Sequence, residues 1–220
     1  SIERGYVTEQ TVFYHMYDDG TGEIGVIMIL SFDGKTADQF AQAVEELQNQ
    51  GARALIFDVR YNPGGALDSI VEILDTILPE GPIVRIENSD GSVEVLDSDA
   101  DEMNLPMAVL VNGSTASAAE LFSSALQDYK KAVLVGTTTY GKGCMQQIVR
   151  LVDNSAIRVT TNMYDPPFSD NYDGIGVVPD VVIEADDITL NSNRYTIADG
   201  DDNQLSVAAE LMHERLSAAE

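Results

Sequence analysis

The chain has 220 residues, of which 44% are hydrophobic and 22% are charged, an ordinary composition for one large globular domain or two small ones. A net charge of −25, from 12 basic and 37 acidic residues, argues against nucleic-acid and anionic-membrane partners, because both bind basic surfaces. A single cysteine excludes an internal disulfide framework, no signal-peptide pattern opens the chain, and the longest apolar run, residues 24–30, is too short to span a bilayer.

The first half of the sequence alternates between strand and helix patterns. Residues 6–17 are rich in aromatic and β-branched side chains, which predicts a strand. Phe40, Val44 and Leu47 share one face of a predicted helix that Thr36 can cap. In chain order the predictions are strands 6–17 and 24–30, helix 36–50, strand 53–59, helix 67–78, and a hairpin of 83–86 with 93–96.

The second half continues the alternation. We predict strand 107–111, helix 116–129, strand 132–135, a two-stranded ribbon of 145–152 with 156–163, and a last helix over 203–216. Strands that alternate with helices favour an α/β core with right-handed crossovers. We expect one domain over residues 1–220, with the α/β core in 1–187 and a C-terminal extension and helix in 188–220.

The loop G-T-T-T-Y-G-K-G-C, Gly136 to Cys144, comes close to a phosphate-binding loop. Gly143 stands where that motif needs a Ser or Thr hydroxyl to hold magnesium. The residues that follow predict a strand, whereas a phosphate loop opens a helix whose amides face the anion. The charge of −25 would also repel a triphosphate. The sequence therefore argues against a nucleotide, and no cofactor is expected.

Lys142 still needs an explanation, because it stands between two glycines. It is either a solvated lysine in a turn or an uncharged general base, which an apolar enclosure favours. A base needs a nucleophile, and the best candidate is Ser117, 25 positions upstream. Ser117 follows a buried strand and begins a predicted helix, where backbone amides can stabilise a developing oxyanion. A serine in that position is otherwise a helix cap.

A second glycine-rich loop, N-P-G-G at residues 62–65, follows a buried strand and precedes a helix. Glycines leave backbone N–H groups accessible, as an oxyanion hole requires. The same pattern also suits an ordinary turn between a strand and a helix.

Together these segments resemble the carboxyl-terminal processing protease family, also called tail-specific proteases. Each motif is modest alone, but their order and the Ser-to-Lys spacing make the set specific, and the resemblance covers residues 6–184. The four signatures, in order, are D-V-R-Y-N-P-G-G, N-G-S-T-A-S-A-A-E, G-T-T-T-Y-G-K-G-C-M-Q and D-G-I-G-V-V-P-D.

The resemblance implies a serine endopeptidase that cleaves polypeptides near their C-termini through an acyl-enzyme. Ser117 matches the family's nucleophile and Lys142 its general base. Gln146 matches a residue that orients the lysine in some members. Thr115 and Ala119 replace serines that are common in the family, and neither is expected to carry the chemistry.

The resemblance also implies the groups around this pair. The oxyanion donors would be the amide of Ala118 and one amide from Gly64 or Gly65, and Arg60 would give structural support. The fold would be crotonase-like, a stack of β-β-α units. Family members usually carry an export signal and a peptide-binding PDZ domain before this core, so we expect a PDZ domain in the full-length protein and a location outside the cytoplasm.

Other candidates for chemistry are weaker. His15 lies in a predicted strand and His213 in the last helix, and neither adjoins a nucleophile motif. Asp199, Asp201, Asn203 and Glu210 have the spacing of a calcium loop, but its required glycine is absent. We expect Asp201 or Asp202 to cap the last helix instead. These patterns predict no metal site.

Two further features leave alternatives open. The acidic stretch 97–102 is interpreted as a solvated loop. Cys144 is either a reactive thiol or a small residue that starts a strand. The main alternative to a protease is a non-catalytic peptide- or lipid-binding module on the same fold, which needs no Ser–Lys–Gln set. An acyl-CoA enzyme of the crotonase type would share the oxyanion site but would need no Ser–Lys pair.

Overall fold

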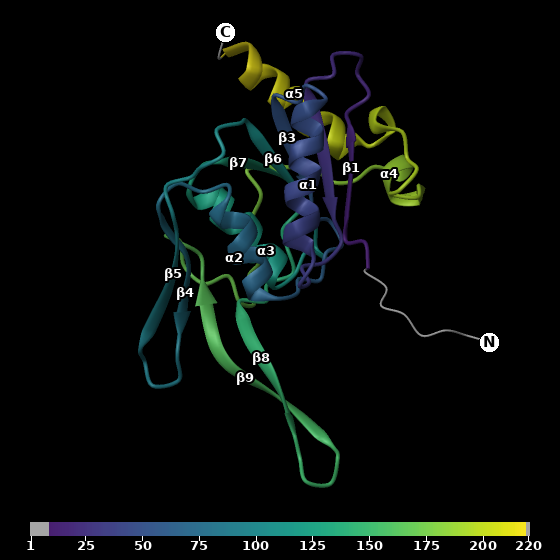
Figure 1. Ribbon diagram of the computed structural model, residues 1–220. Coiled ribbons are helices and arrows are strands. Elements are labelled where there is room, and N and C mark those ends of the chain that lie inside the picture. The colour runs from purple at the N-terminus through teal and green to yellow at the C-terminus, as the bar shows by residue number, and fades with distance from the viewer. Residues whose placement is uncertain (1–8, 219–220) are drawn as a thin grey trace, which may run out of the picture.

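The computed structural model describes residues 9–218, which form two β-sheets and a set of covering helices (Figure 1). The six-stranded sheet has the order β1-β2-β3-β6-β7-β10, in which only the β1–β2 pair is antiparallel. Its strands are β1 (Val12–Met16), β2 (Ile24–Ile29), β3 (Ala54–Asp58), β6 (Met107–Val111), β7 (Ala132–Gly136) and β10 (Val181–Val182).

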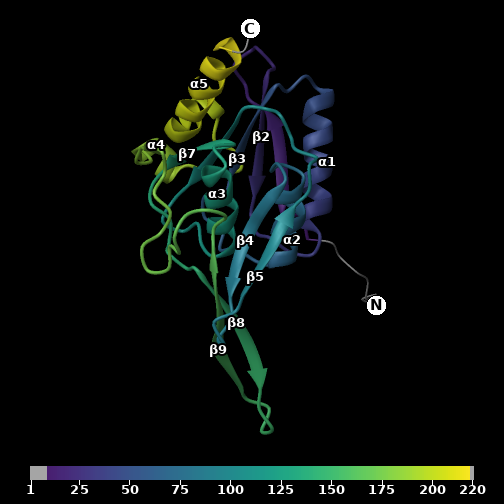
Figure 2. The ribbon, with the colours of Figure 1, turned by 90° about the vertical axis from the view of Figure 1, so that its left-hand side faces the viewer.

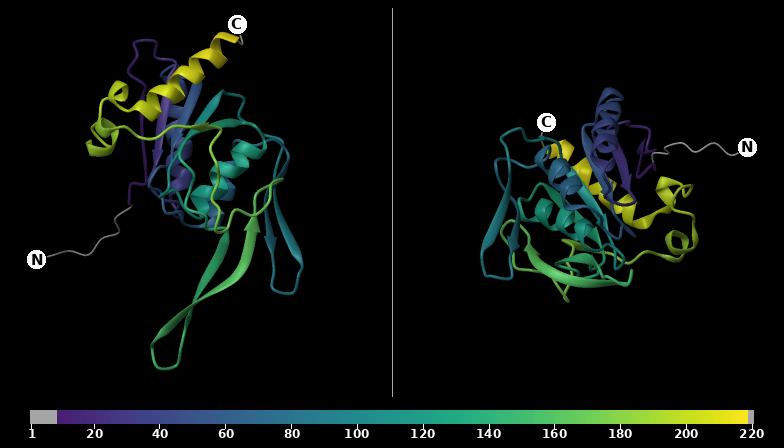
Figure 3. Two further views of the ribbon diagram at one scale, coloured as in Figure 1. Left: turned by 180° about the vertical axis from the view of Figure 1, so that it is seen from behind. Right: turned by 60° about the horizontal axis from the view of Figure 1, so that its bottom comes forward.

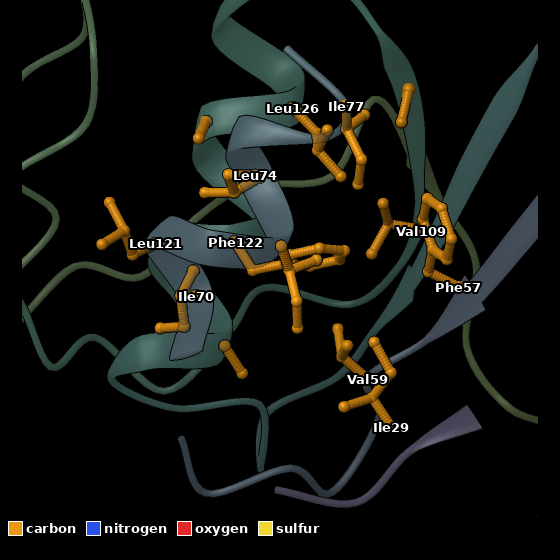
Figure 4. Close-up of a cluster of buried hydrophobic side chains, with 14 of the residues drawn as sticks. Ile29, Phe57, Val59, Ile70, Leu74, Ile77, Val109, Leu121, Phe122 and Leu126 are labelled. Carbon is orange, nitrogen blue, oxygen red and sulfur yellow. The ribbon is translucent and has the colours of Figure 1, made fainter. Parts of the chain in front are cut away.

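Helices cover both faces of this sheet. All five residues of β3 and all five of β6 are buried, which explains why these strands are continuous apolar runs without alternation. One face carries α1 (Thr36–Asn49), α2 (Leu67–Asp75) and α3 (Ala118–Asp128), and the opposite face carries α5 (Asn203–Ala218) (Figure 2). In the first layer Phe57 of β3 meets Phe122 of α3 edge to face, with ring centroids 5.6 Å apart (Figure 4).

The second sheet has four strands in the order β5-β4-β9-β8. They are β4 (Gly81–Glu87), β5 (Val93–Ser98), β8 (Cys144–Arg150) and β9 (Ala156–Asp165). The β8–β9 hairpin reaches away from the body as a long arm beside the shorter β4–β5 hairpin (Figures 1 and 3). Most side chains of this arm are exposed, because only its base packs against the core.

The register of the parallel strands gathers three loops at one edge. Asp58 of β3 lies opposite Leu110 of β6, and Val111 of β6 lies opposite Gly136 of β7. The carboxyl ends of parallel strands meet at one sheet edge, so the loops after β3, β6 and β7 come together there. These loops carry three of the four sequence signatures.

The α/β class is confirmed, and so are the predicted strands and helices within residues 9–218, apart from small shifts at their ends. The start of the first predicted strand, residues 6–8, lies outside the described residues. Sequence reasoning missed three short elements, β10, the helix α4 (Asp187–Asn191) and the 3-10 helix η1 (Asp199–Asp201), because each is too short to show a periodic pattern.

Two expectations about organisation remain predictions, namely the repeated β-β-α units and the division at residue 187. The helix α5 packs on β3, β6 and β7 and forms a second buried cluster with them, centred on residues such as Ile56 and Met212. Within residues 9–218, no helix combines the length and the apolar character needed to cross a bilayer.

Candidate active site

Ser117 is presented on a sharp turn between a strand and a helix. The strand β6 ends at Val111, and α3 begins at Ala118, directly after the serine. Ser117 has φ 58° and ψ −121°, a conformation that costs a non-glycine residue roughly 1–3 kcal/mol. Such a turn lifts a side chain clear of the helix, as the strained strand-to-helix turn of α/β-hydrolases does.

The carboxylate of Glu120 holds this turn against the loop that carries Lys142. It accepts hydrogen bonds from the amide of Ser117 (2.8 Å), the hydroxyl of Thr139 (2.5 Å), and the amides of Gly141 (2.6 Å) and Lys142 (2.8 Å). Glu120 is fully buried. Because all four partners are donors, an acceptor-only carboxylate satisfies every one of them. One side chain thereby fixes the serine turn and the lysine loop relative to each other.

We expect Glu120→Gln to lower the free energy of unfolding by about 1–3 kcal/mol, because the new amide group turns its own N–H donors toward buried donors. The change would also loosen the lysine loop from the serine turn. Urea unfolding followed by circular dichroism measures the effect on stability.

Glu46→Gln is the matched control, because it removes the same charge from an exposed position on α1. We expect that variant to stay within about 0.5 kcal/mol of the wild type. Equal stability of the Glu120 and Glu46 variants would contradict the bridging role of Glu120.

The loop of residues 62–65 lies against the serine turn. Gly64 has φ 100°, and a side chain there would place its Cβ 2.8 Å from the Cβ of Ser117. A side chain at Gly65 would overlap the carbonyl oxygen of Phe32. Only glycines therefore allow the two loops to approach this closely.

The two glycine amides differ in availability. The amide of Gly64 donates to Asn62 Oδ1 at 2.8 Å. The amides of Gly65 and Ala118 donate to no acceptor among residues 9–218. Of the two glycine donors considered from the sequence, Gly65 is thus the one with a free N–H group.

A cavity of about 310 Å³ brings most of the predicted residues together. Ser117, Ala118, Gly65, Lys142 and Gln146 all line it, whereas Gly64 does not. The strand β8 contributes one wall, with a bulge between Met145 and Gln146 that shifts its register against β9. The other lining residues are Leu67, Leu121, Cys144, Met145, Ile148, Arg158 and Tyr164.

Tyr164 of β9 connects the serine and the lysine loop from the other side. Its hydroxyl donates to the carbonyl oxygen of Lys142 at 2.8 Å and lies within hydrogen-bond distance of Ser117 Oγ, at 3.2 Å. Burial raises the pKa of Tyr164 to about 12. The hydroxyl therefore stays protonated at neutral pH and can hold the serine oxygen in place.

Comparison with known proteins identifies the family of this chain. The family model of peptidase family S41 matches residues 23–183, which is most of the chain and includes all four sequence signatures. The chain belongs to peptidase family S41. The expectation drawn from the signatures is confirmed at the level of the family.

Curated S41 relatives share about a third of their residues with this chain. The carboxy-terminal-processing protease of Bartonella bacilliformis is 36% identical over 171 residues, which cover 74% of this chain and 39% of the relative. The carboxyl-terminal-processing protease of Synechocystis sp. is 35% identical over 186 residues, 84% of this chain and 44% of the relative. The chain thus spans less than half the length of these S41 relatives.

Solved S41 structures share the fold. A photosystem II D1 C-terminal processing protease superposes with a TM-score of 0.72 at 31% identity, over 81% of this chain and 49% of that one. A putative S41 protease from Bacteroides fragilis superposes with a TM-score of 0.77 at 19% identity, over 94% and 59% of the two chains. The second likeness concerns the fold alone.

Arg60, the predicted supporting residue of this S41 chain, lies outside the cavity of Ser117. It is buried between β3 and the start of α5, and it pairs with Asp58 (2.8 Å) and Asp202 (2.6 Å). It borders a separate cavity of about 820 Å³ between β1 and the segment before α5. Arg60 therefore does not line the cavity of Ser117, and its place suits support of β3 and the start of α5.

The weaker candidates from the sequence also lie away from Ser117, with one exception. His15 pairs with Asp199 (2.9 Å) and His213 with Asp19 (2.6 Å), and both pairs connect the C-terminal segment to the β1–β2 hairpin. Asp202 caps α5, as one of the two predicted caps. Among residues 9–218, no cluster of three or more metal-type ligands occurs. The exception is Cys144, which begins β8 and lines the cavity.

Sequence reasoning overlooked two residues of this S41 site. Glu120 had a local signal, because a serine followed three residues later by a glutamate, ahead of an apolar run, is a helix capping box. That signal predicts the bond to the Ser117 amide but not the bonds to residues 139–142. Tyr164 had no local signal, because its place depends on the register of β9.

Proposed function

We propose that this chain is the catalytic core of a serine endopeptidase that cleaves polypeptides near their C-termini with a Ser117–Lys142 dyad. The observation that carries the proposal is the convergence on one cavity of Ser117, Lys142 and the two free amides of Ala118 and Gly65. A nucleophile, a base and oxyanion donors are the groups that acyl transfer requires.

In the first half of the reaction, the uncharged amine of Lys142 takes the hydroxyl proton as Ser117 Oγ attacks the peptide carbonyl carbon. The amides of Gly65 and Ala118 stabilise the resulting oxyanion. The C–N bond then breaks, and the leaving amine receives the proton from the lysine. An ester between Ser117 and the substrate remains, and one fragment departs.

In the second half, Lys142 takes a proton from water as the water attacks the ester carbonyl. The tetrahedral intermediate uses the same two amides, and its collapse returns the proton to Ser117 and releases the second fragment. Gln146 lines the cavity on the strand that follows the lysine, which suits a role in orienting the amine.

Family membership extends the proposal to the whole protein. We expect polypeptide substrates, a PDZ domain in the full-length protein and a location outside the cytoplasm. These expectations rest on the resemblance to carboxyl-terminal processing proteases.

Cleavage of casein by the wild type and by Ser117→Ala tests the proposal, with fragments identified by mass spectrometry. We expect the wild type to cleave casein and Ser117→Ala to lose cleavage entirely. Ser114→Ala is the matched control, because Ser114 lies in the same turn but is not part of the cavity lining. Cleavage by Ser117→Ala at the wild-type rate would overturn the assignment of the nucleophile.

A further inference from the structure

The charge of the cavity differs from that of the whole chain. The chain carries 37 acidic and 12 basic residues, yet the residues that line the cavity of Ser117 include Lys142 and Arg158 and no aspartate or glutamate. The buried Glu120 lies behind the lining and is saturated by four donors. Because the proposed mechanism uses Lys142 as an uncharged amine, Arg158 is the residue that gives this lining a positive charge, on a strongly anionic protein.

The β8–β9 arm carries this local charge. Residues 142–165 contain three basic residues, Lys142, Arg150 and Arg158, and two acidic residues, Asp153 and Asp165 at the base of the arm. Among residues 9–218, Lys35, Arg53, Arg60, Lys131 and Arg194 have acidic partners within ion-pair distance. Arg158 has none, and neither do Arg85, Lys130, Lys142, Arg150 and Arg215 in the same part of the chain. Of these basic residues without an acidic partner, Lys142 and Arg158 line the cavity of Ser117, so the guanidinium of Arg158 is available there for a ligand.

The register of the arm places Arg158 along the path of a substrate. Arg158 of β9 lies opposite Ile148 of β8, and both line the cavity. The strand β8 is the outer strand of its sheet, so one of its edges is free to pair with an extended peptide. Arg158 stands across β8 from that free edge, but its side chain lies on the same face of the β8–β9 pair as Ile148 and Gln146. A substrate that extends from Ser117 over this face passes Gln146 and Ile148 and reaches Arg158.

We propose that Arg158 is a specificity-determining residue that binds a carboxylate of the polypeptide substrate, while Ile148 contacts an apolar side chain beside it. The carboxylate is an Asp or Glu side chain, or the free C-terminus of the substrate. A guanidinium binds a carboxylate through two parallel hydrogen bonds. The anionic remainder of the chain repels such a substrate elsewhere and leaves this site as the favourable one. The inference rests on the proposed protease function.

Peptides that differ in a single charge test this inference. One pair carries Glu or Gln at the same position, and a second pair has a free or an amidated C-terminus. We expect the wild type to prefer the carboxylate member of one pair by about tenfold in kcat/KM, the scale of a charge-assisted hydrogen bond. The pair that shows the preference identifies the source of the carboxylate. The preference should shrink as salt is added.

Variants of the two arm arginines show which residue is responsible. We expect Arg158→Gln to abolish the preference for the carboxylate peptide while the member of each pair that lacks the carboxylate is still cleaved. Arg158→Lys should keep part of the preference. Arg150→Gln removes the same charge from the same arm outside the cavity lining, and it should leave the preference unchanged. Binding of the same peptides to Ser117→Ala, measured by fluorescence anisotropy, should show the same ratios without cleavage.

The outcomes separate this inference from the proposed function. If the wild type cleaves casein but treats both members of each pair alike, the inference is overturned and the protease function stands. The inference is also overturned if Arg158→Gln keeps the wild-type ratio. If neither casein nor any peptide is cleaved and Ser117→Ala binds none of them, both proposals fail.

Discussion

Lys142→Ala is expected to lower kcat for peptide cleavage by a factor on the order of 10³ or more, because the proposed mechanism relies on the amine of Lys142 to take the proton of Ser117. The fold should survive, since the Lys142 side chain is only partly buried and its backbone amide keeps the bond to Glu120. Steady-state kinetics on a peptide substrate, together with the melting temperature of each variant, measures both effects.

The pH dependence gives a second test of the same role. Wild-type activity should rise toward alkaline pH, because only the uncharged amine accepts a proton, and the residual activity of Lys142→Ala should lack this rise. The hydroxyl of Tyr164 does not mimic the effect below pH 11, since burial raises its pKa to about 12. Lys35→Ala, which changes an exposed lysine directly before α1, is the control. A rise with pH that persists in Lys142→Ala would contradict the role of the lysine.

Arg60→Met is expected to lower the free energy of unfolding by about 3–5 kcal/mol, because it removes the cation that both buried carboxylates share and leaves only the more distant Arg194, 3.9 Å from Asp58. The guanidinium donates to Asp58 (3.0 and 2.8 Å) and to Asp202 (3.0 and 2.6 Å), and both aspartates are 2% exposed. For a chain of this size, the melting temperature should fall by about 10 °C. Differential scanning calorimetry measures the shift.

The difference in the free energy of unfolding between Arg60→Met and the wild type should become smaller as the pH falls. Burial alone would raise the pKa of Asp58, but the charge of Arg60 and its hydrogen bonds outweigh burial and hold that pKa below its ordinary value. In the wild type this stabilisation is therefore present above the ordinary aspartate range and is lost as the pH falls through the pKa of the folded state. Without Arg60 the buried carboxylates bind protons more readily. The free energy of unfolding of the variant therefore falls less than that of the wild type as the pH is lowered.

Arg215→Met is the control for Arg60, because Arg215 is exposed in the last turn of α5. It should change the free energy of unfolding by less than about 0.5 kcal/mol. Adding Asp58→Asn and Asp202→Asn to Arg60→Met should recover part of the loss, since no buried charge then remains. A loss for Arg60→Met as small as that for Arg215→Met would show that the buried pairs contribute little.

The order of elements could be predicted because the central strands and the main helices carry strong local patterns. The strands β3 and β6 are continuous apolar runs, and α1 places Phe40, Val44 and Leu47 on one buried face. The three loops with chemical motifs each follow one of the buried parallel strands. Ser117 and Lys142 could be paired as candidates because a general base needs a nucleophile and because both match motifs of one protease family.

The sequence by itself thus determined the α/β class, the family and the candidate residues of the proposed Ser–Lys dyad and oxyanion site. Only the tertiary structure decided which amide is free, since the bond from Gly64 to Asn62 depends on how one loop turns. It also decided that Glu120 joins the serine turn to the lysine loop, that Tyr164 reaches both, and that Arg158 lines the same cavity. Local patterns record which face of an element is buried, whereas these contacts depend on the register and packing of segments that are distant in the chain.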